Sequence, residues 1–171
     1  MMNVRALHSS DALAYRALML QGYAKDADAF ATTAEERSAE PASWWLKRIC
    51  DSNGLSQGFG AFHEGSLVGG VAIEYSTKFK VRHKALIVGM FVAEQHRRLG
   101  AGRALLQAAI SHARGRPGVK LIALAVTEGN AEAVRLYSSA GFRQFGLEAM
   151  AIFTGTEYKS RVHMQMQLAA S

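Results

Sequence analysis

Two almost unbroken apolar runs on either side of one amphipathic segment constrain the fold of this chain most. Residues 83–92 and 119–126 are dominated by Val, Ile, Leu and Ala, a composition typical of strands buried on both faces. The segment between them, residues 103–114, places Leu, Ala and Ile side chains on one face of a helix. This order predicts two parallel strands joined by a right-handed helical crossover.

Weaker patterns on both sides of this unit predict the remaining elements. Helices are expected over residues 10–22, 41–50 and 130–140, and strands over residues 57–63, 67–75, 142–153 and 157–168. Residues 23–40 show no clear period and predict a mobile surface segment. No repeat or linker divides the 171 residues. We therefore expect one domain, residues 1–171, built on a mixed sheet.

Composition limits the classes of protein that this chain can represent. The longest uncharged apolar run, Ala85–Ala93, is far shorter than the roughly 20 residues of a spanning helix. The first residues lack the apolar stretch of a signal peptide, so we expect a cytoplasmic protein without membrane partners. Cys50 is the single cysteine and is expected to be a small buried apolar side chain.

Positive charge is concentrated in the middle of the chain. Residues 78–120 hold ten Lys and Arg residues against one acid, Glu94. This excess indicates an anionic ligand, either a phosphorylated small molecule or a nucleic acid. A solvated basic surface would explain it equally well.

One junction in this basic region has the character of an anion site. Residues 97–103, Arg-Arg-Leu-Gly-Ala-Gly-Arg, join the first apolar run to the helix. The first N–H groups of a helix lack internal partners, and glycines allow a phosphate to approach the main chain. Alternatively, Gly100 and Gly102 only permit a tight turn. The residues match neither a P-loop, since no Gly-Lys pair exists, nor a dinucleotide fingerprint, since Leu105 replaces its third glycine.

Two motifs in this half of the chain resemble those of the GNAT superfamily of N-acetyltransferases. The signature [QR]-x-x-G-x-[GA] reads Arg97-x-x-Gly100-x-Gly102, and Asn130-x-x-Ala133-x-x-Leu136-Tyr137-x-x-x-Gly141-Phe142 follows at the usual distance. The resemblance covers roughly residues 67–168. It implies an α/β fold with a twisted, mostly antiparallel mixed sheet of six to seven strands, about four flanking helices, and the parallel unit at the cofactor site.

The same resemblance implies acetyl-CoA as cosubstrate and assigns residues to it. The signature turn would hold the pyrophosphate, the preceding strand end would hydrogen-bond the pantetheine arm, and a bulge at Gly89 would separate this strand from the next and leave donors for the thioester carbonyl. The implied cofactor residues are Met90, Phe91, Val92, Arg97, Arg98, Leu99, Gly100, Ala101, Gly102, Arg103, Asn130 and Tyr137.

Tyr137 is by resemblance the general acid that protonates the leaving thiolate. Asn130 and Tyr137 lie seven residues apart on one helix, so they share a face. Asn130 can instead be only a helix cap, and Tyr137 a core aromatic residue.

The general base is less defined, because Ala125 occupies the place where some relatives carry a catalytic glutamate. Glu74, His83 and Glu148 are the candidates. Alternatively, Glu74 and Glu148 are solvent-facing strand residues and His83 is a polar strand end. His63, His96 and His163 are too scattered to predict a metal site.

Acceptor recognition is expected in residues 23–45 and 151–158. Phe30, Trp44 and Trp45 could wall a pocket for an amine that nearby acids attract; the alternative is a solvated acidic loop anchored by two tryptophans. The acids are Asp26, Asp28, Glu35, Glu36 and Glu40.

These observations favour an N-acetyltransferase that moves an acetyl group from acetyl-CoA directly to a primary amine of a small molecule or peptide, in a ternary complex and without a metal. The absent strand glutamates keep open a catalytically silent acetyl-CoA sensor. A nucleic-acid binder would explain the basic charge but gives no reason for the paired Asn130 and Tyr137. The resemblance is compatible with a homodimer.

Overall fold

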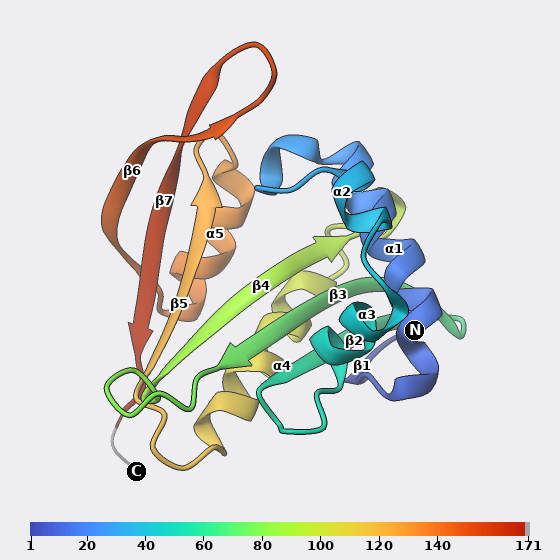
Figure 1. Cartoon of the computed structure of the whole chain (residues 1–171), viewed down its shortest axis with the longest axis horizontal. Helices are drawn as coiled ribbons and strands as arrows, with labels where there is room; N and C mark the ends of the chain where they lie inside the picture. The colour runs from blue at the N-terminus through green and yellow to red at the C-terminus, as the bar shows by residue number, and fades with distance from the viewer. Residues whose placement is uncertain (170–171) are drawn as a thin grey trace.

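The fold is built on one seven-stranded sheet with the order β1-β2-β3-β4-β5-β7-β6 (Figure 1). The structure is a computed structural model that describes residues 1–169. Within these residues, β4 and β5 are the one parallel pair, and the other neighbours are antiparallel. The strands are β1 (Met2–Ala6), β2 (Ser56–His63), β3 (Ser66–Tyr75), β4 (Lys84–Val92), β5 (Leu121–Thr127), β6 (Arg143–Phe153) and β7 (Tyr158–Gln167).

Five α-helices and three 3₁₀ turns connect these strands in the described part of the chain. They are η1 (Ser9–Asp11), α1 (Ala12–Lys25), η2 (Ala27–Ala29), α2 (Ala34–Ser38), α3 (Ala42–Ile49), η3 (Glu94–His96), α4 (Ala101–Arg114) and α5 (Ala131–Ala140). The predicted strand, helix, strand unit is confirmed as β4, α4 and β5. The predicted α/β class with a mostly antiparallel mixed sheet is also confirmed, with one helix more than expected.

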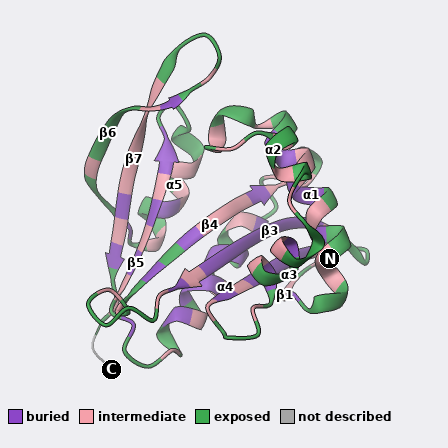
Figure 2. Ribbon diagram, viewed as in Figure 1, coloured by how far each residue is buried: buried purple, intermediate pink, exposed green. Residues whose placement is uncertain are grey.

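Helices cover both faces of the β1–β4 half of the sheet. A Cβ added at Gly69 would lie 3.2 Å from Leu105 of α4, whereas one at Gly70 would lie 3.4 Å from Tyr15 of α1. Neighbouring strand residues point to opposite faces, so α4 packs on one face and α1 on the other. Figure 2 shows that buried residues concentrate along β3, while β6 is mostly exposed.

The sheet splits between its two parallel strands. β4 and β5 pair only over Lys84–Leu86 and Leu121–Ala123, and beyond these residues the strands diverge (Figure 1). A register shift opposite Gly70–Ala72 places an additional residue in β4 near Gly89, which has φ +63°. The bulge expected at Gly89 is therefore confirmed. The two halves of the sheet form a V that is closed at the start of β4 and open at its end.

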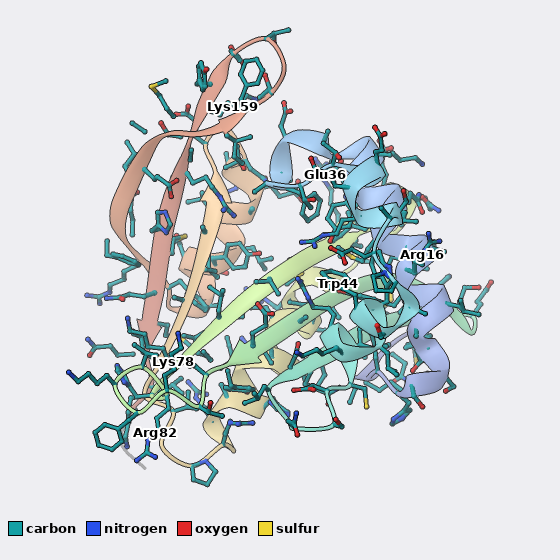
Figure 3. The ribbon with its side chains drawn as sticks, viewed as in Figure 1. Arg16, Glu36, Trp44, Lys78, Arg82 and Lys159 are labelled. Carbon is teal, nitrogen blue, oxygen red and sulfur yellow. The ribbon has the colours of Figure 1, made fainter. Side chains whose placement is uncertain are left out.

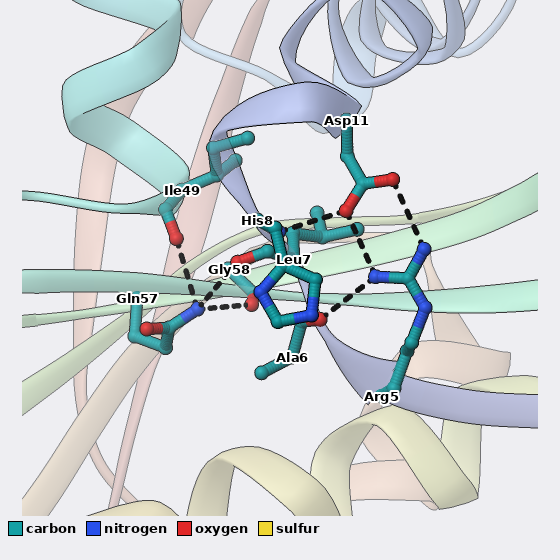
Figure 4. Close-up of polar contacts among 8 residues, drawn as sticks. All are labelled: Arg5, Ala6, Leu7, His8, Asp11, Ile49, Gln57 and Gly58. Atoms are coloured by element: carbon teal, nitrogen blue, oxygen red, sulfur yellow. Dashed lines mark hydrogen bonds and ion pairs between the residues drawn. The ribbon is translucent and has the colours of Figure 1, made fainter.

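Hydrogen bonds hold the N-terminal strand to its surroundings (Figure 4). Arg5 donates two bonds to the Asp11 carboxylate, at 2.8 and 3.0 Å. The Gln57 side-chain amide donates to the carbonyls of Leu7, Ile49 and Gly58, at 3.2, 2.9 and 2.8 Å. These contacts join β1, the end of α3 and β2.

Three features of the N-terminal half differ from the expectations. The strand β1 was not predicted, because five residues give too short a pattern. The segment 23–40 contains η2 and α2, and the first turn of α2 has a capping box in which Thr33 and Glu36 bond each other's main-chain N–H groups. Cys50 is exposed rather than buried. None of the helices within residues 1–169 is long and apolar enough to span a membrane.

Candidate active site

The turn that enters α4 presents free main-chain donors to open space. Arg98 and Gly100 both adopt left-handed conformations, with φ +62° and φ +85°. The N–H of Ala104 makes the first helical bond, to the Gly100 carbonyl at 3.0 Å, which leaves the N–H groups of residues 101–103 without helical partners. A Cβ at Gly100 would meet nothing within 4 Å. The positive end of the helix dipole and these donors suit an anionic group.

Arg97 stabilises this turn and is not a free cation, which differs from its expected place among the phosphate-binding residues. Its Nε donates to the Val92 carbonyl at 2.9 Å, and its Nη2 lies 2.6 Å from Oδ2 of Asp26. The guanidinium also lies 5.7 Å from the centre of the Phe91 ring. Arg98 and Arg103, by contrast, are exposed and carry the positive charge at this turn.

The end of β4 has one free edge. Phe91 and Val92 pair with β3 through Gly70 and Gly69, whereas on the β5 side the pairing ends at Leu86. The Phe91 side chain is buried against α1, so its main chain is the part that a ligand in the gap would contact. Met90 and Val92 are partly buried against the main core.

Asn130 lies at the start of α5, and Tyr137 lies seven residues further along the same helix. Asn130 caps the helix, since its Oδ1 accepts a bond from the Ala133 N–H at 3.2 Å. Tyr137 is 6% exposed, and its ring lies 6.0 Å from that of Phe142. Burial raises the pKa of Tyr137 to about 12, so its hydroxyl keeps its proton at neutral pH and can donate it to a hydrogen bond.

Two clefts border the α4 turn. The larger, about 480 Å³, lies between the η2 segment, the loop after β5 and β7; its lining residues are Lys25, Asp26, Ala27, Asp28, Ala29, Arg97, Thr127, Glu128, Gly129, Asn130 and Lys159. The smaller, about 290 Å³, lies between α4 and α5 and is lined by Arg103, Leu106, Gln107, Leu136, Ser139 and Ala140.

The three predicted base candidates lie in different parts of the sheet. His83 directly precedes β4 and accepts bonds from Lys120 and Leu121 through its carbonyl, which places it at the closed end of the V. Six residues of strand, about 20 Å, separate it from Gly89, which is far from the place where an amine at the bulge would lose its proton. Glu74 pairs with Leu86 at the vertex of the V. Glu148 on β6 lies 2.8 Å from Nε2 of His163.

The predicted acceptor pocket is only partly present. Trp45 is 1% exposed and packs edge-on against Tyr15 at 6.0 Å, so it is a core residue and not a pocket wall. Trp44 is partly exposed and lies between two guanidinium groups, of Arg37 at 4.3 Å and Arg48 at 4.8 Å. Phe30 packs edge-on against Tyr23 at 4.7 Å.

Several of the predicted amine-attracting acids are already paired. Asp26 binds Arg97, and Asp28 lies 3.4 Å from Lys159 of β7, which connects the η2 segment to the other half of the sheet. Glu36 caps α2. Of the five acids, Glu35, Glu36 and Glu40 make no ion pair among residues 1–169.

Sequence reasoning missed Lys159 and assigned no catalytic role to His163. Lys159 lines the larger cleft, and His163 pairs with Ala125 of β5. No motif marks either residue, because their positions depend on the register between β7 and β5. Lys78 and Arg82 of the central basic segment lie at the closed end of the V, whereas Lys159 of β7 lies at the opposite end (Figure 3). Within the described residues, no group of three His, Cys, Asp or Glu side chains could hold a metal ion.

The split mixed sheet, with the free N–H groups of the α4 turn beside the split, fits an acyl-CoA N-acyltransferase, and the family match supports this class. The chain belongs to the Acetyltransferase (GNAT) family, whose sequence model matches residues 20–142. A search of curated proteins gave no match.

Solved structures have the same fold over nearly the whole chain. A GCN5-related N-acetyltransferase from Kribbella flavida is 26% identical, with a TM-score of 0.82 and 98% of each chain covered. A putative acetyltransferase from Salmonella typhimurium, solved with its cofactor acetyl-CoA, is 20% identical, with a TM-score of 0.82 and coverage of 100% of this chain and 96% of that one. A ribosomal-protein-alanine N-acetyltransferase from Brucella melitensis is 24% identical, with a TM-score of 0.80 and coverage of 97% and 99%. The last two similarities establish the fold alone.

Proposed function

We propose that this protein transfers an acetyl group from acetyl-CoA to a primary amine of a small molecule or peptide, directly and in a ternary complex. One observation carries the proposal: the free edge of β4 beyond Leu86 lies beside the donor-rich turn at Gly100. A flexible arm that carries a diphosphate at one end and a thioester at the other fits these two features together. The Salmonella relative with bound acetyl-CoA supports the same ligand.

The residues around the turn fit the charges of coenzyme A. The N–H groups of residues 101–103 would bind the pyrophosphate, and Arg98 and Arg103 would add positive charge. The main chain of Met90–Val92 would hydrogen-bond the pantetheine arm as an added strand. When bound, acetyl-CoA supplies an acetyl group on a good leaving group.

The chain itself supplies orientation and proton transfer. The bulge at Gly89 turns main-chain donors toward the gap, where they stabilise negative charge on the thioester oxygen. Tyr137, protonated at neutral pH, donates its hydroxyl hydrogen to the departing sulfur. Cys50 lies at the end of α3, outside both clefts, so direct attack by the amine is favoured over a covalent enzyme intermediate.

A screen of primary amines with acetyl-CoA, read by release of free thiol, tests this function. The melting temperature is measured in parallel with and without millimolar acetyl-CoA, because a ligand that binds only the folded state raises it. We expect both a thermal shift and turnover with at least one amine. Absence of a shift would refute the cofactor assignment. A shift without turnover by any amine would instead indicate a sensor of acetyl-CoA.

A further inference from the structure

A carboxylate–imidazole pair lies on the half of the sheet that carries β5. Nε2 of His163, on β7, lies 2.8 Å from Oε1 of Glu148, on β6. His163 is the direct cross-strand partner of Ala125 on β5. The main chain of His163 is therefore one strand away from the gap, which is about 4.8 Å in the plane of a sheet, while its imidazole contacts β6 through Glu148.

Strand alternation places this pair on the face opposite α4 and α5. Leu124 of β5 and Met164 of β7 belong to the core that contains Leu105 and Tyr137. Ala125 follows Leu124 by one position, and His163 precedes Met164 by one position. Both side chains therefore point to the other face. On the β1–β4 half of the sheet, the same face is covered by α1, whose Tyr15 lies under Gly70.

The register of the sheet puts His163 at the open part of the V. Ala125 lies two residues, about 7 Å, beyond Ala123, the last residue of β5 that pairs with β4. The bulge at Gly89 lies three residues beyond Leu86 on the facing strand. Ala123 and Ala125 carry only methyl groups, so the side chains of β5 leave space between the imidazole and the gap.

Glu74, the other candidate, has a less favourable position. It pairs with Leu86, at the vertex of the V and about 10 Å along β4 from Gly89. The side chain of Leu86, which is 44% exposed, lies on the same face as Glu74, and β4 carries it between Glu74 and the gap. A base that acts on an amine at the bulge is therefore better placed on β7 than on β3.

We propose that His163 is the catalytic base that deprotonates the acceptor ammonium, and that Glu148 is its positioning residue. This inference rests on the proposed acetyltransferase function and names the residue that acts as its general base. His163 takes one proton from the ammonium, and the neutral amine then forms the C–N bond as the C–S bond breaks. The thiolate takes the proton of the Tyr137 hydroxyl, the second proton of the attacking nitrogen restores that hydroxyl, and the proton on His163 passes to solvent. The Glu148 carboxylate accepts the bond from Nε2–H and stabilises the imidazolium, which leaves Nδ1 for the amine.

The charged groups around His163 are few within the described residues. Arg161 on β7 points to the same face two residues away, and on β6 the neighbours on this face are Arg143 and Glu148. β5 presents no titratable group, since Ala123, Ala125 and Thr127 face this side. Across the gap, a guanidinium nitrogen of Arg48 on α3 lies 3.6 Å from the place of a Cβ at Gly89, and Glu74 is the charged group that β3 presents on this face.

The exposure of the pair argues against a mainly structural role. The side chains of His163 and Glu148 are 34% and 51% exposed, and exposed pairs of this kind contribute little to the stability of a fold. Variants at either position should therefore fold. Their effects on activity can then be read separately from stability.

The test compares H163A, E148Q and E74Q with H83A as a matched histidine control at the closed end of the V. The acceptor is the best primary amine from the screen above, and kcat/KM is measured from pH 5 to 9. We expect H163A to lose about 100-fold or more in kcat/KM, the usual contribution of a general base, and E148Q to lose about 10-fold. H83A and E74Q should stay within about 3-fold of the wild type. All four variants should keep the thermal shift with acetyl-CoA.

Two further measurements separate proton transfer from structure. Imidazole in solution should restore part of the activity of H163A and none of the activity of E74Q. The acid-side decline of kcat/KM, which follows protonation of the base, should disappear in H163A. Activity of H163A within 3-fold of the wild type, or a large loss in E74Q with H163A intact, would overturn the assignment while leaving the acetyltransferase function in place. Absence of turnover by the wild type would refute the function itself.

Discussion

Replacement of Gly100 by leucine gives the sharpest test of the cofactor site, because the chain contains a matched control. Gly100 has φ +85° and Gly118, in the loop after α4, has φ +87°; a Cβ at either position meets nothing within 4 Å. G100L and G118L therefore carry the same backbone penalty, about 1–2 kcal/mol for an L-residue in the left-handed region. In a chain of this size, that penalty lowers the melting temperature by about 2–8 °C.

The two variants should respond differently to acetyl-CoA. A concentration 100 times the dissociation constant stabilises the folded state by about 2.7 kcal/mol, which raises the melting temperature by about 5–11 °C. We expect this rise in the wild type and in G118L, measured by differential scanning fluorimetry. It should be absent in G100L, where the new side chain occupies the space in front of the free N–H groups. A normal rise in G100L would show that the diphosphate binds elsewhere.

Three further predictions concern the acid, the N-terminal ion pair and the core. Y137F should lower kcat about 100-fold, as expected for loss of a general acid, while the thermal shift with acetyl-CoA is unchanged; an unchanged kcat would remove Tyr137 from this role. The hydrogen bonds from Arg5 lower the pKa of Asp11, so the ion pair stabilises the fold above the unfolded pKa of about 4. D11N should be less stable than the wild type in urea at pH 7, and the difference should disappear as the pH falls through the lowered pKa; a difference that is equal at pH 7 and pH 2.5 would contradict this. A Cβ at Gly58 would lie only 2.9 Å from Cβ of Ile49, so G58A should cost about 1–3 kcal/mol, and a melting temperature equal to that of the wild type would show that α3 moves freely.

The central part of the fold was predictable because its local and long-range signals agree. The apolar runs that became β4 and β5 needed a buried face, and the stripe of α4 had to pack on it. The expectation that these strands are buried on both faces is wrong for β4, where Leu86 is 44% exposed. The capping pair Thr33 and Glu36 was visible as a T-x-x-E pattern and could have predicted α2. β1 carries no comparable signal.

The catalytic assignments were less predictable because they depend on strand register. His83 and Glu74 are both close to the signature turn in sequence, but the antiparallel and parallel pairings place them at the closed end and the vertex of the V. His163 is distant from every motif, and only its pairing with Ala125 brings it near the gap. Trp45 has the composition of a pocket residue, but its place on the inner side of α3 buries it.

The split in the sheet also has a consequence for how this protein behaves without its cosubstrate. Open strand edges are templates on which other chains can add, and this fold keeps two of them in its interior rather than at its rim. The pantetheine arm, when bound, would form hydrogen bonds with the unpaired main-chain groups of these edges. Samples kept in excess coenzyme should accordingly exchange the amide hydrogens of residues 90–92 more slowly and aggregate less during storage than samples kept without it.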